Sequence, residues 1–333
     1  MRKALAIYAK QFSLTFDEVA MGSQPADVVF YRANLNNKEV TGVTGLSWSG
    51  NPDYNIKTSN DVHINVAAYN DSDGMQPGSY AFQALLHEIG HALGLQHPND
   101  YGSQVTVGRL ASLPQNQDYV KNTVMSYNQD DFIAKEQLSM FDVATLEYMY
   151  GVNPDVNQGN TIYTLTPPSH YITDGSGIDL LDAAGQTANL NINLTPGSWN
   201  YAGAKSDSIL ADGQLFIGYD TLLENINAGS GNDTLTGNHL ANSINGGTGN
   251  DRIAGGLGVD VLNGEAGDDV LIYDISDYIN GGLGKDTLKI TGTDDIQPGE
   301  FSRVKNVEVL DLTDSQSQQV TLSAKDVLDM TDS

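Results

Sequence analysis

The chain of 333 residues contains no cysteine. Disulfide bonds, thiolate metal sites and cysteine nucleophiles are therefore excluded. Basic residues are also scarce, because 16 Lys and Arg stand against 42 Asp and Glu, a formal charge of −26. Nucleic acids and anionic membranes both require positive surface, so neither is expected as a partner. No apolar run approaches the roughly 18 residues of a membrane-spanning helix, so we expect no membrane insertion.

The surplus of carboxylates is typical either of a self-repelling soluble surface or of a chain that collects hard cations. Extracellular domains often depend on disulfides, and one without them needs another means of stabilisation. Bound metal ions are the obvious candidate.

The composition changes partway along the chain. Apolar residues recur at helical spacing in residues 4–20 and 138–150, which predicts two helices. They alternate like those of strands in residues 26–35 and 61–69. Gly151 ends the second predicted helix, and Pro154 with a polar stretch indicates a boundary. The first part therefore reads as a mixed α/β domain, and the remainder is rich in Gly, Asn and Asp.

A nine-residue repeat begins at Ala228. Five units follow one another without a break, AGSGNDTLT, GNHLANSIN, GGTGNDRIA, GGLGVDVLN and GEAGDDVLI. After an eight-residue interruption, GGLGKDTLK resumes at Gly281. The second unit is degenerate, with Ala241 and Asn242 where a glycine and an aspartate would stand.

Each part of the repeat has a physical meaning. Glycines permit the positive φ of a tight turn, and the aspartate at the sixth position offers oxygen ligands. The eighth position is always apolar and points into a shared core, at Leu235, Ile244, Ile253, Leu262, Leu271 and Leu288. Stacked units of one turn and one short strand build a parallel β-roll. Stacked aspartates repel one another, so this roll should need Ca²⁺. A flexible linker would not keep the apolar spacing.

Three of the six histidines lie in HEIGHALGLQHP, residues 87–98. We predict a helix over 77–94, with Ser79 as N-cap and Gly94 at its end. His87 and His91, four residues apart, then project from one face. Gly94 lets the chain reverse, so that His97 returns as a third imidazole.

Three neutral imidazoles with one open position suit a catalytic Zn²⁺. Glu88 is placed to reach a water on the metal and to act as the general base. The alternative is that the three histidines are surface or core residues without a metal, since HExxH alone occurs by chance in amphipathic helices. The added glycine and third histidine make chance coincidence far rarer. NTVMSYNQ, with Met125 and Tyr127, matches the Met-turn that accompanies such sites.

Together, HEIGHALGLQHP, VMSY and the glycine/aspartate repeats resemble serralysin, the secreted bacterial zinc metalloproteases of the metzincin clan that carry RTX calcium-binding repeats. DGSGIDLLDAAG and LLENINAGSGNDTLTGN also look like the second domain of that family. The resemblance implies an α+β metzincin catalytic domain followed by an all-β parallel β-roll domain. It places the catalytic domain at 1–152 and the calcium-binding roll at 153–295. Residues 296–333 form a β-rich segment, similar to a module of very large adhesins or to an export region.

The resemblance also assigns roles to residues. His87, His91 and His97 would bind zinc, Glu88 would be the general base, and Met125 would lie under the metal. Tyr127 would be a further zinc ligand that swings away to stabilise the oxyanion. The calcium ligands would be Gly229, Gly231, Asp233, Gly247, Gly249, Asp251, Gly256, Gly258, Asp260, Gly267, Asp269, Gly282, Gly284 and Asp286.

Protein and peptide substrates, a proteinaceous inhibitor and a monomeric state are what we expect of partners and assembly. The family binds substrate along an edge strand, for which we take Val43 to Gly50. Secretion by a one-step exporter, with folding in extracellular calcium, would agree with the missing cysteines.

A different reading is a calcium-binding adhesin or surface module with a vestigial protease domain. The adhesin-like tail favours it, and the intact set of metal-site residues speaks against it. His63, His170 and His239 have no partners at ligand spacing, so we predict surface or packing roles for them. GSGIDLLDAAG fits either a calcium site or a simple turn.

Overall fold

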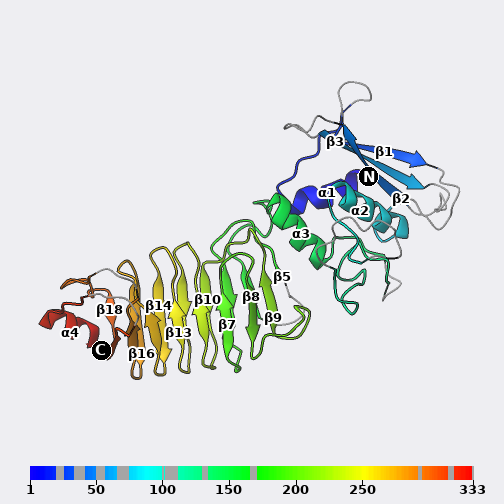
Figure 1. The fold of residues 1–333 in the computed structure, drawn as a ribbon. Helices are drawn as coiled ribbons and strands as arrows, with labels where there is room; N and C mark the ends of the chain where they lie inside the picture. Colours follow the sequence, from blue (N-terminus) through cyan, green and yellow to red (C-terminus); the bar gives the residue numbers. More distant parts are fainter. Residues whose placement is uncertain are drawn as a thin grey trace. The chain divides into compact units, whose positions relative to one another are not determined.

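The computed structural model describes residues 1–19, 26–33, 42–49, 57–65, 75–99, 101, 112–129, 134–165, 171–291, 295–313 and 319–331. The chain forms two compact units, Met1–Asn153 and Pro154–Ser333. Figure 1 shows helices with a small sheet in the first unit and stacked short strands in the second. The predicted α+β domain followed by a parallel β-roll is confirmed.

The first unit contains three helices and a three-stranded sheet among its described residues. The helices are α1 (Arg2–Gln11), α2 (Tyr80–Ala92) and α3 (Met140–Tyr150), and the strands are β1 (Val28–Ala33), β2 (Gly42–Ser49) and β3 (Lys57–Asn65). The sheet order is β1-β3-β2, with β1 parallel and β2 antiparallel to β3. The predicted substrate strand thus falls on an edge strand, and its last residue, Gly50, lies outside the described residues.

The centre of this unit is α2, which is buried around most of its circumference, including Phe82, Leu86 and Ile89. α1 packs behind it, and the Tyr8 hydroxyl donates a hydrogen bond to the Leu86 carbonyl at 2.7 Å. Burial of this kind fixes the helix firmly, because each large apolar side chain contributes about 1.5–3 kcal/mol.

The first helix is shorter than its apolar spacing predicted. It ends at Gln11, and Phe12 has extended backbone with φ −121° and ψ 160°. Phe12 is fully buried and forms an antiparallel bridge with Val152. The reason is tertiary, since pairing with the end of the unit replaces further helical hydrogen bonds.

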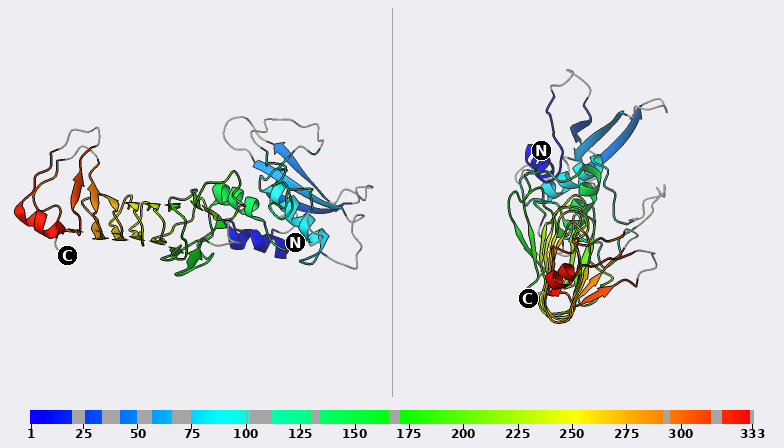
Figure 2. Two further views of the ribbon diagram at one scale, coloured as in Figure 1. Left: turned by 90° about the horizontal axis from the view of Figure 1, so that it is seen from below. Right: turned by 90° about the vertical axis from the view of Figure 1, so that its left-hand side faces the viewer.

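The second unit is built from two sheets of short strands. The strands are β4 (Ile162–Thr164), β5 (Tyr171–Ile172), β6 (Leu180–Asp182), β7 (Leu190–Asn193), β8 (Trp199–Ala202), β9 (Gln214–Ile217), β10 (Asn225–Asn227), β11 (Thr234–Thr236), β12 (Ser243–Asn245), β13 (Arg252–Ala254), β14 (Val261–Ala266), β15 (Val270–Ile272), β16 (Tyr278–Leu283), β17 (Thr287–Lys289), β18 (Val304–Lys305) and β19 (Val309–Asp311). One sheet runs β18-β16-β14-β12-β10-β6-β4 and the other β19-β17-β15-β13-β11-β7-β8-β9-β5. In the right-hand view of Figure 2, the turns of this unit overlay one another as a flattened coil.

Successive repeat units alternate between the two sheets, so each strand pairs with the strand two units away. Leu235 pairs with Ile253, 18 residues later, and Ile253 pairs in turn with Leu271. The eighth-position side chains are all within 1% of full burial and share one core. Only β7-β8 and β8-β9 pair antiparallel among the described strands of this unit. The repeat therefore builds the roll that its spacing predicted.

The C-terminal segment continues the same architecture. β18 extends one sheet and β19 the other, each by parallel pairing. The helix α4 (Ala324–Thr331) follows, and its Met330 is buried in the core of the roll. Within the described residues, no helix combines the length and apolar character needed to cross a membrane.

Candidate functional site

α2 carries three of the predicted site residues, and both of its ends are capped. The Ser79 hydroxyl accepts a hydrogen bond from the Phe82 N–H at 3.1 Å, which confirms the predicted N-cap. At the other end Gly94 has φ +102°, its N–H donates to the His91 carbonyl, and the Leu95 N–H donates to the Gly90 carbonyl. This is a Schellman motif, and it turns the chain back toward the helix.

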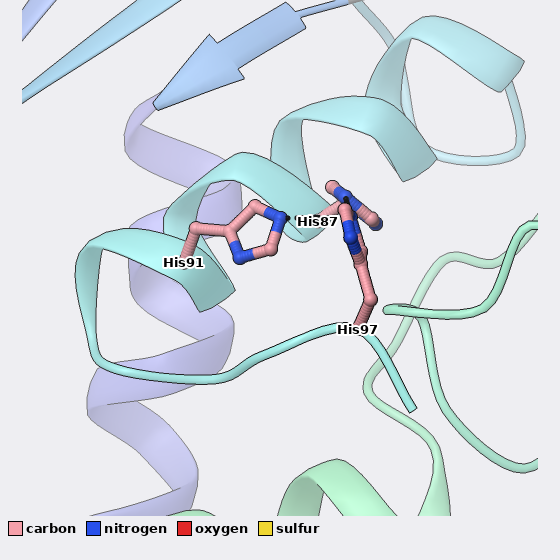
Figure 3. A group of neighbouring side chains, drawn as sticks. All are labelled: His87, His91 and His97. Atoms are coloured by element: carbon pink, nitrogen blue, oxygen red, sulfur yellow. Dashed lines mark hydrogen bonds between the residues drawn. The ribbon is translucent and has the colours of Figure 1, made fainter. Parts of the chain in front are cut away.

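The turn brings the third histidine to the other two. Nε2 of His97 lies 3.2 Å from Nε2 of His87 and 3.1 Å from Nε2 of His91. The three ligand atoms all lie within 4.8 Å of one another. Figure 3 shows two rings rising from α2 and the third approaching from the following loop.

Backbone carbonyls hold the two helical imidazoles from behind. Nδ1 of His87 lies 2.8 Å from the Val124 carbonyl, and Nδ1 of His91 lies 2.8 Å from the Leu95 carbonyl. A carbonyl only accepts, so each Nδ1 carries the proton and each Nε2 presents its lone pair to the centre. Burial, then the neighbouring His91, lowers the pKa of His87 to about 3, and burial also lowers the pKa of His91.

This donor set fits zinc. Zinc–nitrogen bonds of about 2.0–2.1 Å in a tetrahedron separate the ligand atoms by roughly 3.4 Å. The observed separations of 3.1 and 3.2 Å are close to that value. Neutral imidazoles with convergent Nε2 atoms are the form in which histidine binds metal.

Glu88 and Tyr127 both lie near the cluster. Glu88 is buried, at 4% exposure, and is close enough to Tyr127 for its charge to affect the phenol. Burial, with Glu88 second, raises the pKa of Tyr127, so the phenol is protonated at neutral pH. Tyr127 is 58% exposed, and its ring centroid lies 4.5 Å from that of His97.

Met125 lies beside the histidine helix and is 1% exposed. A Cβ added at Gly90 would lie 2.8 Å from Met125 Sδ and 3.2 Å from Leu95 Cδ1. The glycine between the first two histidines therefore lets the Met-turn approach the helix. Met125 thus contacts the helix that carries the histidines, and its place under the metal stays a prediction.

The turn around Met125 is fixed by Asp142 of α3, a residue that the sequence reasoning missed. Its carboxylate accepts hydrogen bonds from the Thr123 hydroxyl (2.6 Å), the Val124 N–H (2.8 Å) and the Ser139 N–H (2.9 Å). Val124 is also the residue whose carbonyl holds His87. Burial raises the pKa of Asp142 to about 6. Asp142 thus supports the histidine cluster indirectly, through Val124.

Aspartates of the repeat form ladders along the two edges of the roll. Each ladder consists of rungs, in which the backbone N–H of a residue on one coil donates a hydrogen bond to Oδ1 of the aspartate stacked on it in the next coil. On one edge the bonds run from Leu190 to Asp233 (2.7 Å), Asp233 to Asp251 (2.8 Å), Asp251 to Asp269 (2.8 Å) and Asp269 to Asp286 (2.9 Å). On the other they run from Asn242 to Asp260 (2.7 Å) and Asp260 to Asp277 (2.9 Å).

The eight-residue interruption of the repeat is itself a shortened repeat unit. The eight residues 273–280 form one further repeat unit, half of a coil, which is one residue shorter than the others. Asp277 occupies the ladder position, and Ile279 pairs with Leu262 in the buried eighth position. The missing glycines concealed this unit in the sequence.

The second carboxylate oxygen of most ladder aspartates has no hydrogen-bond partner although it is buried. These atoms are Oδ2 of Asp179, Asp251, Asp260, Asp269 and Asp286. A buried, unpaired carboxylate oxygen is costly. Burial raises the pKa of Asp251 to about 7 and of Asp269 to about 6. A hard cation with oxygen ligands would satisfy these atoms, so the donors fit Ca²⁺.

The repeat glycines make room for these oxygens and for the stacked turns. A Cβ on Gly255 would lie 2.1 Å from Asp260 Oδ2, and one on Gly264 would lie 2.2 Å from Asp269 Oδ2. Gly249 has φ +120°, and a Cβ there would lie 2.1 Å from the Gly231 carbonyl oxygen. No side chain fits at these positions while the turns remain in register.

The degenerate second unit is held by amides. The turn stacked on it places Gly256 over Asn238 and Gly258 over Leu240, so the substituted glycine positions are 238 and 240, not 241. Asn242 Oδ1 accepts from the Asn238 N–H at 2.8 Å. The Asn238 amide donates to the Leu223 carbonyl at 2.7 Å, and the Asn242 amide donates to the Glu224 carbonyl at 3.1 Å. The amides of this rung are hydrogen-bonded within the protein, so we expect the degenerate unit to lack a calcium ion.

The stretch GSGIDLLDAAG contains another ladder residue. Asp179 is fully buried, its N–H donates to Glu224 Oε2 at 2.7 Å, and its Oδ2 is unpaired. Asp174, nearby in sequence, is 2% exposed and accepts from the Tyr163 hydroxyl at 2.5 Å. Asp179 therefore shares the feature of the repeat aspartates, and it stands at the sixth position of DGSGIDLLD, a unit with the glycines of the repeat and with Leu181 buried at the eighth position.

Two family models match the chain. The matrixin model matches residues 1–150, and the RTX calcium-binding nonapeptide repeat matches residues 224–239, 240–271 and 276–288. The chain unites a matrixin domain with RTX calcium-binding repeats. A matrixin domain implies zinc and RTX repeats imply calcium, and the histidine cluster and the unpaired carboxylate oxygens supply donors suited to each.

Curated relatives agree with both assignments. The chain is 27% identical to serralysin G of Dickeya chrysanthemi over 71% of its own length and 52% of the relative. It is 32% identical to metallopeptidase AprA of Pseudomonas marginalis over 69% of its length and 48% of the relative. With metalloprotease AprA of Pseudomonas entomophila, identity is 35% over 50% of the chain and 38% of the relative. The chain thus spans about half the length of these relatives or less. The resemblance to serralysins is confirmed.

The remaining predictions concern the three other histidines of the chain. His63 lies on β3 of the matrixin domain and His239 is exposed in a turn of the RTX unit. His170 lies outside the described residues. Their predicted surface or packing roles stay predictions.

Replacing Asp142 with alanine should weaken zinc binding about 10–100-fold, the usual effect of losing a residue that supports a metal ligand. The cause is loss of the Val124 hydrogen bond, which releases the carbonyl behind His87. Competition with a chromophoric chelator measures the affinity. Asp17→Ala, at an exposed carboxylate in the same domain, is the matched control and should leave the affinity unchanged. Equal affinities in the two variants would contradict the role of Asp142.

The calcium-free RTX unit should be more ordered in mild acid. The pKa of an aspartate in an unfolded chain is about 3.9, whereas burial raises the pKa of folded Asp251 to about 7 and that of Asp269 to about 6. The folded unit binds more protons between these values, so its stability falls as pH rises from about 4 to about 7. Circular dichroism without calcium should show more β-structure at about pH 5 than at about pH 8. Calcium, competing with protons, should bind more weakly at the lower pH. A calcium midpoint independent of pH would contradict this.

The double substitution Asn238→Gly and Asn242→Asp should add one calcium ion. It removes both amide donors and supplies the missing carboxylate with room beside it. Calorimetric titration of the variant and the unchanged protein gives the stoichiometry. Asn227→Asp, at a strand position of the same sheet, is the control and should add none. An unchanged stoichiometry in the double variant would contradict the interpretation of this rung.

Proposed function

We propose that the chain is a zinc-dependent endopeptidase whose RTX unit is stabilised by calcium. The observation that carries the proposal is the convergence of three Nε2 atoms, at 3.1 and 3.2 Å, beside a buried glutamate. The matrixin match and the resemblance to serralysin and AprA support it. In this proposal, residues 1–152 are catalytic, residues 153–295 bind calcium, and residues 296–333 are a C-terminal segment similar to an adhesin module or an export region.

His87, His91 and His97 would hold the zinc ion. Zinc, when bound, supplies a Lewis acid that lowers the pKa of a coordinated water to about 7 and polarises the peptide carbonyl. The carbonyls of Val124 and Leu95 keep the two helical imidazoles in the required tautomer and orientation.

Glu88 would be the general base. It takes a proton from the attacking water and delivers it to the amine nitrogen that leaves when the peptide C–N bond breaks. Tyr127 would first complete the metal site and then donate a hydrogen bond to the carbonyl oxygen as negative charge develops. Its protonated, largely exposed phenol over His97 supports that role.

The substrate would be an extended peptide. β2 is an edge strand antiparallel to β3, and its backbone lies beside the histidine helix α2. An edge strand offers unpaired N–H and C=O groups to a peptide that adds one more strand. We propose that Val43 to Ser49 binds substrate in this way.

Calcium would bind at the ladders, through the unpaired oxygens of Asp179, Asp251, Asp260, Asp269 and Asp286 together with turn carbonyls. The repeat glycines predicted as calcium ligands would supply these turn carbonyls. Secretion through a one-step exporter is part of the proposal, because such a roll would stay unfolded in low calcium and fold outside the cell.

Glu88→Gln should reduce kcat on a casein-derived peptide about 10²–10⁴-fold, the usual contribution of a general base. The histidine cluster is untouched, so zinc content should stay at that of the unchanged protein, as measured by atomic emission. Glu18→Gln, at a side chain that is 72% exposed, should keep full activity.

A zinc chelator should abolish activity of the unchanged protein, and added zinc should restore it. Calcium without zinc in protein never exposed to chelator would instead favour an adhesin with a vestigial protease domain. Full activity of Glu88→Gln would overturn the assignment of the base.

A further inference from the structure

A second buried carboxylate lies behind the histidine cluster, outside the residues assigned to catalysis. Asp118 is 2% exposed. Its Oδ1 accepts hydrogen bonds from the hydroxyls of Ser126, at 2.6 Å, and Tyr101. Its Oδ2 accepts from the Asn99 amide at 2.7 Å, and its carbonyl accepts from the Asn128 amide at 2.9 Å. A single carboxylate thus bonds to two separate segments.

Those two segments hold the last histidine and the exposed tyrosine of the site. Asn99 and Tyr101 come just after His97, whereas Ser126 and Asn128 lie on either side of Tyr127. Asp118 therefore fixes the position of one segment relative to the other. Charge-assisted hydrogen bonds of this kind are stronger than neutral ones, and burial strengthens them further.

Tyr101 extends this connection to the catalytic side chain. Its ring stacks on that of Tyr127, with centroids 4.7 Å apart and planes at 27°. Its edge meets the ring of His97 at a centroid distance of 5.9 Å. The Tyr127 N–H also approaches the Tyr101 hydroxyl oxygen, at 3.4 Å. One aromatic ring, anchored at its hydroxyl, thus supports Tyr127 while 58% of that residue is exposed.

We propose that Tyr101, anchored by Asp118, is a positioning residue that holds the phenol of Tyr127 over the histidine cluster. The inference rests on the proposed function, because Tyr127 must act at the zinc and on the carbonyl oxygen. An exposed tyrosine turns about two side-chain bonds, and a stacked neighbour restricts both. Loss of the neighbour leaves the phenol free, so it reaches the oxyanion less often.

The first test compares Tyr101→Leu with Tyr101→Phe. Leucine removes the ring and should lower kcat about three- to tenfold, the factor that corresponds to an aromatic pair. KM and zinc content should stay unchanged. Phenylalanine keeps the ring but loses the bond to Asp118, so its kcat should fall between that of the leucine variant and that of the unchanged protein. Tyr148→Leu, at an exposed tyrosine of α3, is the matched control and should keep full activity.

A double-mutant cycle shows whether Tyr101 acts through Tyr127. Once Tyr127→Phe has removed the phenol, adding Tyr101→Leu should cost little more, because there is no hydroxyl left to position. A full further loss in that background would show that Tyr101 has only a structural role, and would overturn the proposal.

A spectroscopic measurement keeps the test independent of turnover. In protein loaded with Cu²⁺, a phenolate close to the metal gives a visible charge-transfer band. The band should be present in the unchanged protein, absent in Tyr127→Phe, and weakened in Tyr101→Leu at equal copper content. A band of unchanged intensity in Tyr101→Leu would overturn the proposal. Thermal unfolding of each variant, at the same midpoint, shows that the fold is intact.

The two hypotheses fail in different ways. If the unchanged protein binds no zinc and cleaves no peptide, the proposed function fails. If it binds zinc and cleaves peptide, but both Tyr101 variants equal it in kcat and in the copper band, only the positioning role fails.

Discussion

The first unit depends on holding three imidazole nitrogens close together with their lone pairs facing one point. That arrangement is unfavourable without a cation, because nitrogen lone pairs that face one another at such short distances repel. The chain enforces it from behind, through the carbonyls of Val124 and Leu95. Each carbonyl is fixed in turn, one by the Asp142 carboxylate and the other by the Schellman turn at Gly94. The helix, the turn and the third helix therefore serve a single geometry.

The second unit follows the same physical rule with different atoms. Its turns are stacked so closely that glycine is required, and one oxygen of most ladder carboxylates is left without a donor. One unit leaves carboxylate oxygens unpaired and the other brings imidazole nitrogens together, and in each a cation would be stabilised. Nitrogen donors in one unit and oxygen donors in the other select a borderline-soft ion and a hard ion respectively. A chain without cysteine thus has two kinds of metal site.

Much of this could be predicted from sequence, because the informative residues lie close together along the chain. The helix from Ser79 to Gly94 and its histidines occupy one short segment, and the repeat is recognised by its nine-residue period. Residues that act at a distance were missed. Asp142 and Asp118 meet the site only through tertiary folding, and Tyr101, four residues after His97, has no motif that marks its contact with Tyr127.

Two further differences have local causes. Asp277 was hidden because its unit is one residue short and lacks glycines, while its buried Ile279 keeps the register. The first helix was overextended because Phe12 pairs with Val152, which follows it by 140 residues. Apolar periodicity indicates which face of a segment is buried, but it does not predict pairing with residues far away in the sequence.

The alternation of repeat units between two sheets limits how such a roll can change in length. Since Leu235 pairs with Ile253, a duplication of 18 residues inserts one whole coil and leaves both edges as they were. Duplicating a single repeat would instead carry every later unit to the opposite edge, together with the helix that ends the stack. Growth in this architecture therefore proceeds by even numbers of repeats, each pair lengthening the coil by about 4.8 Å.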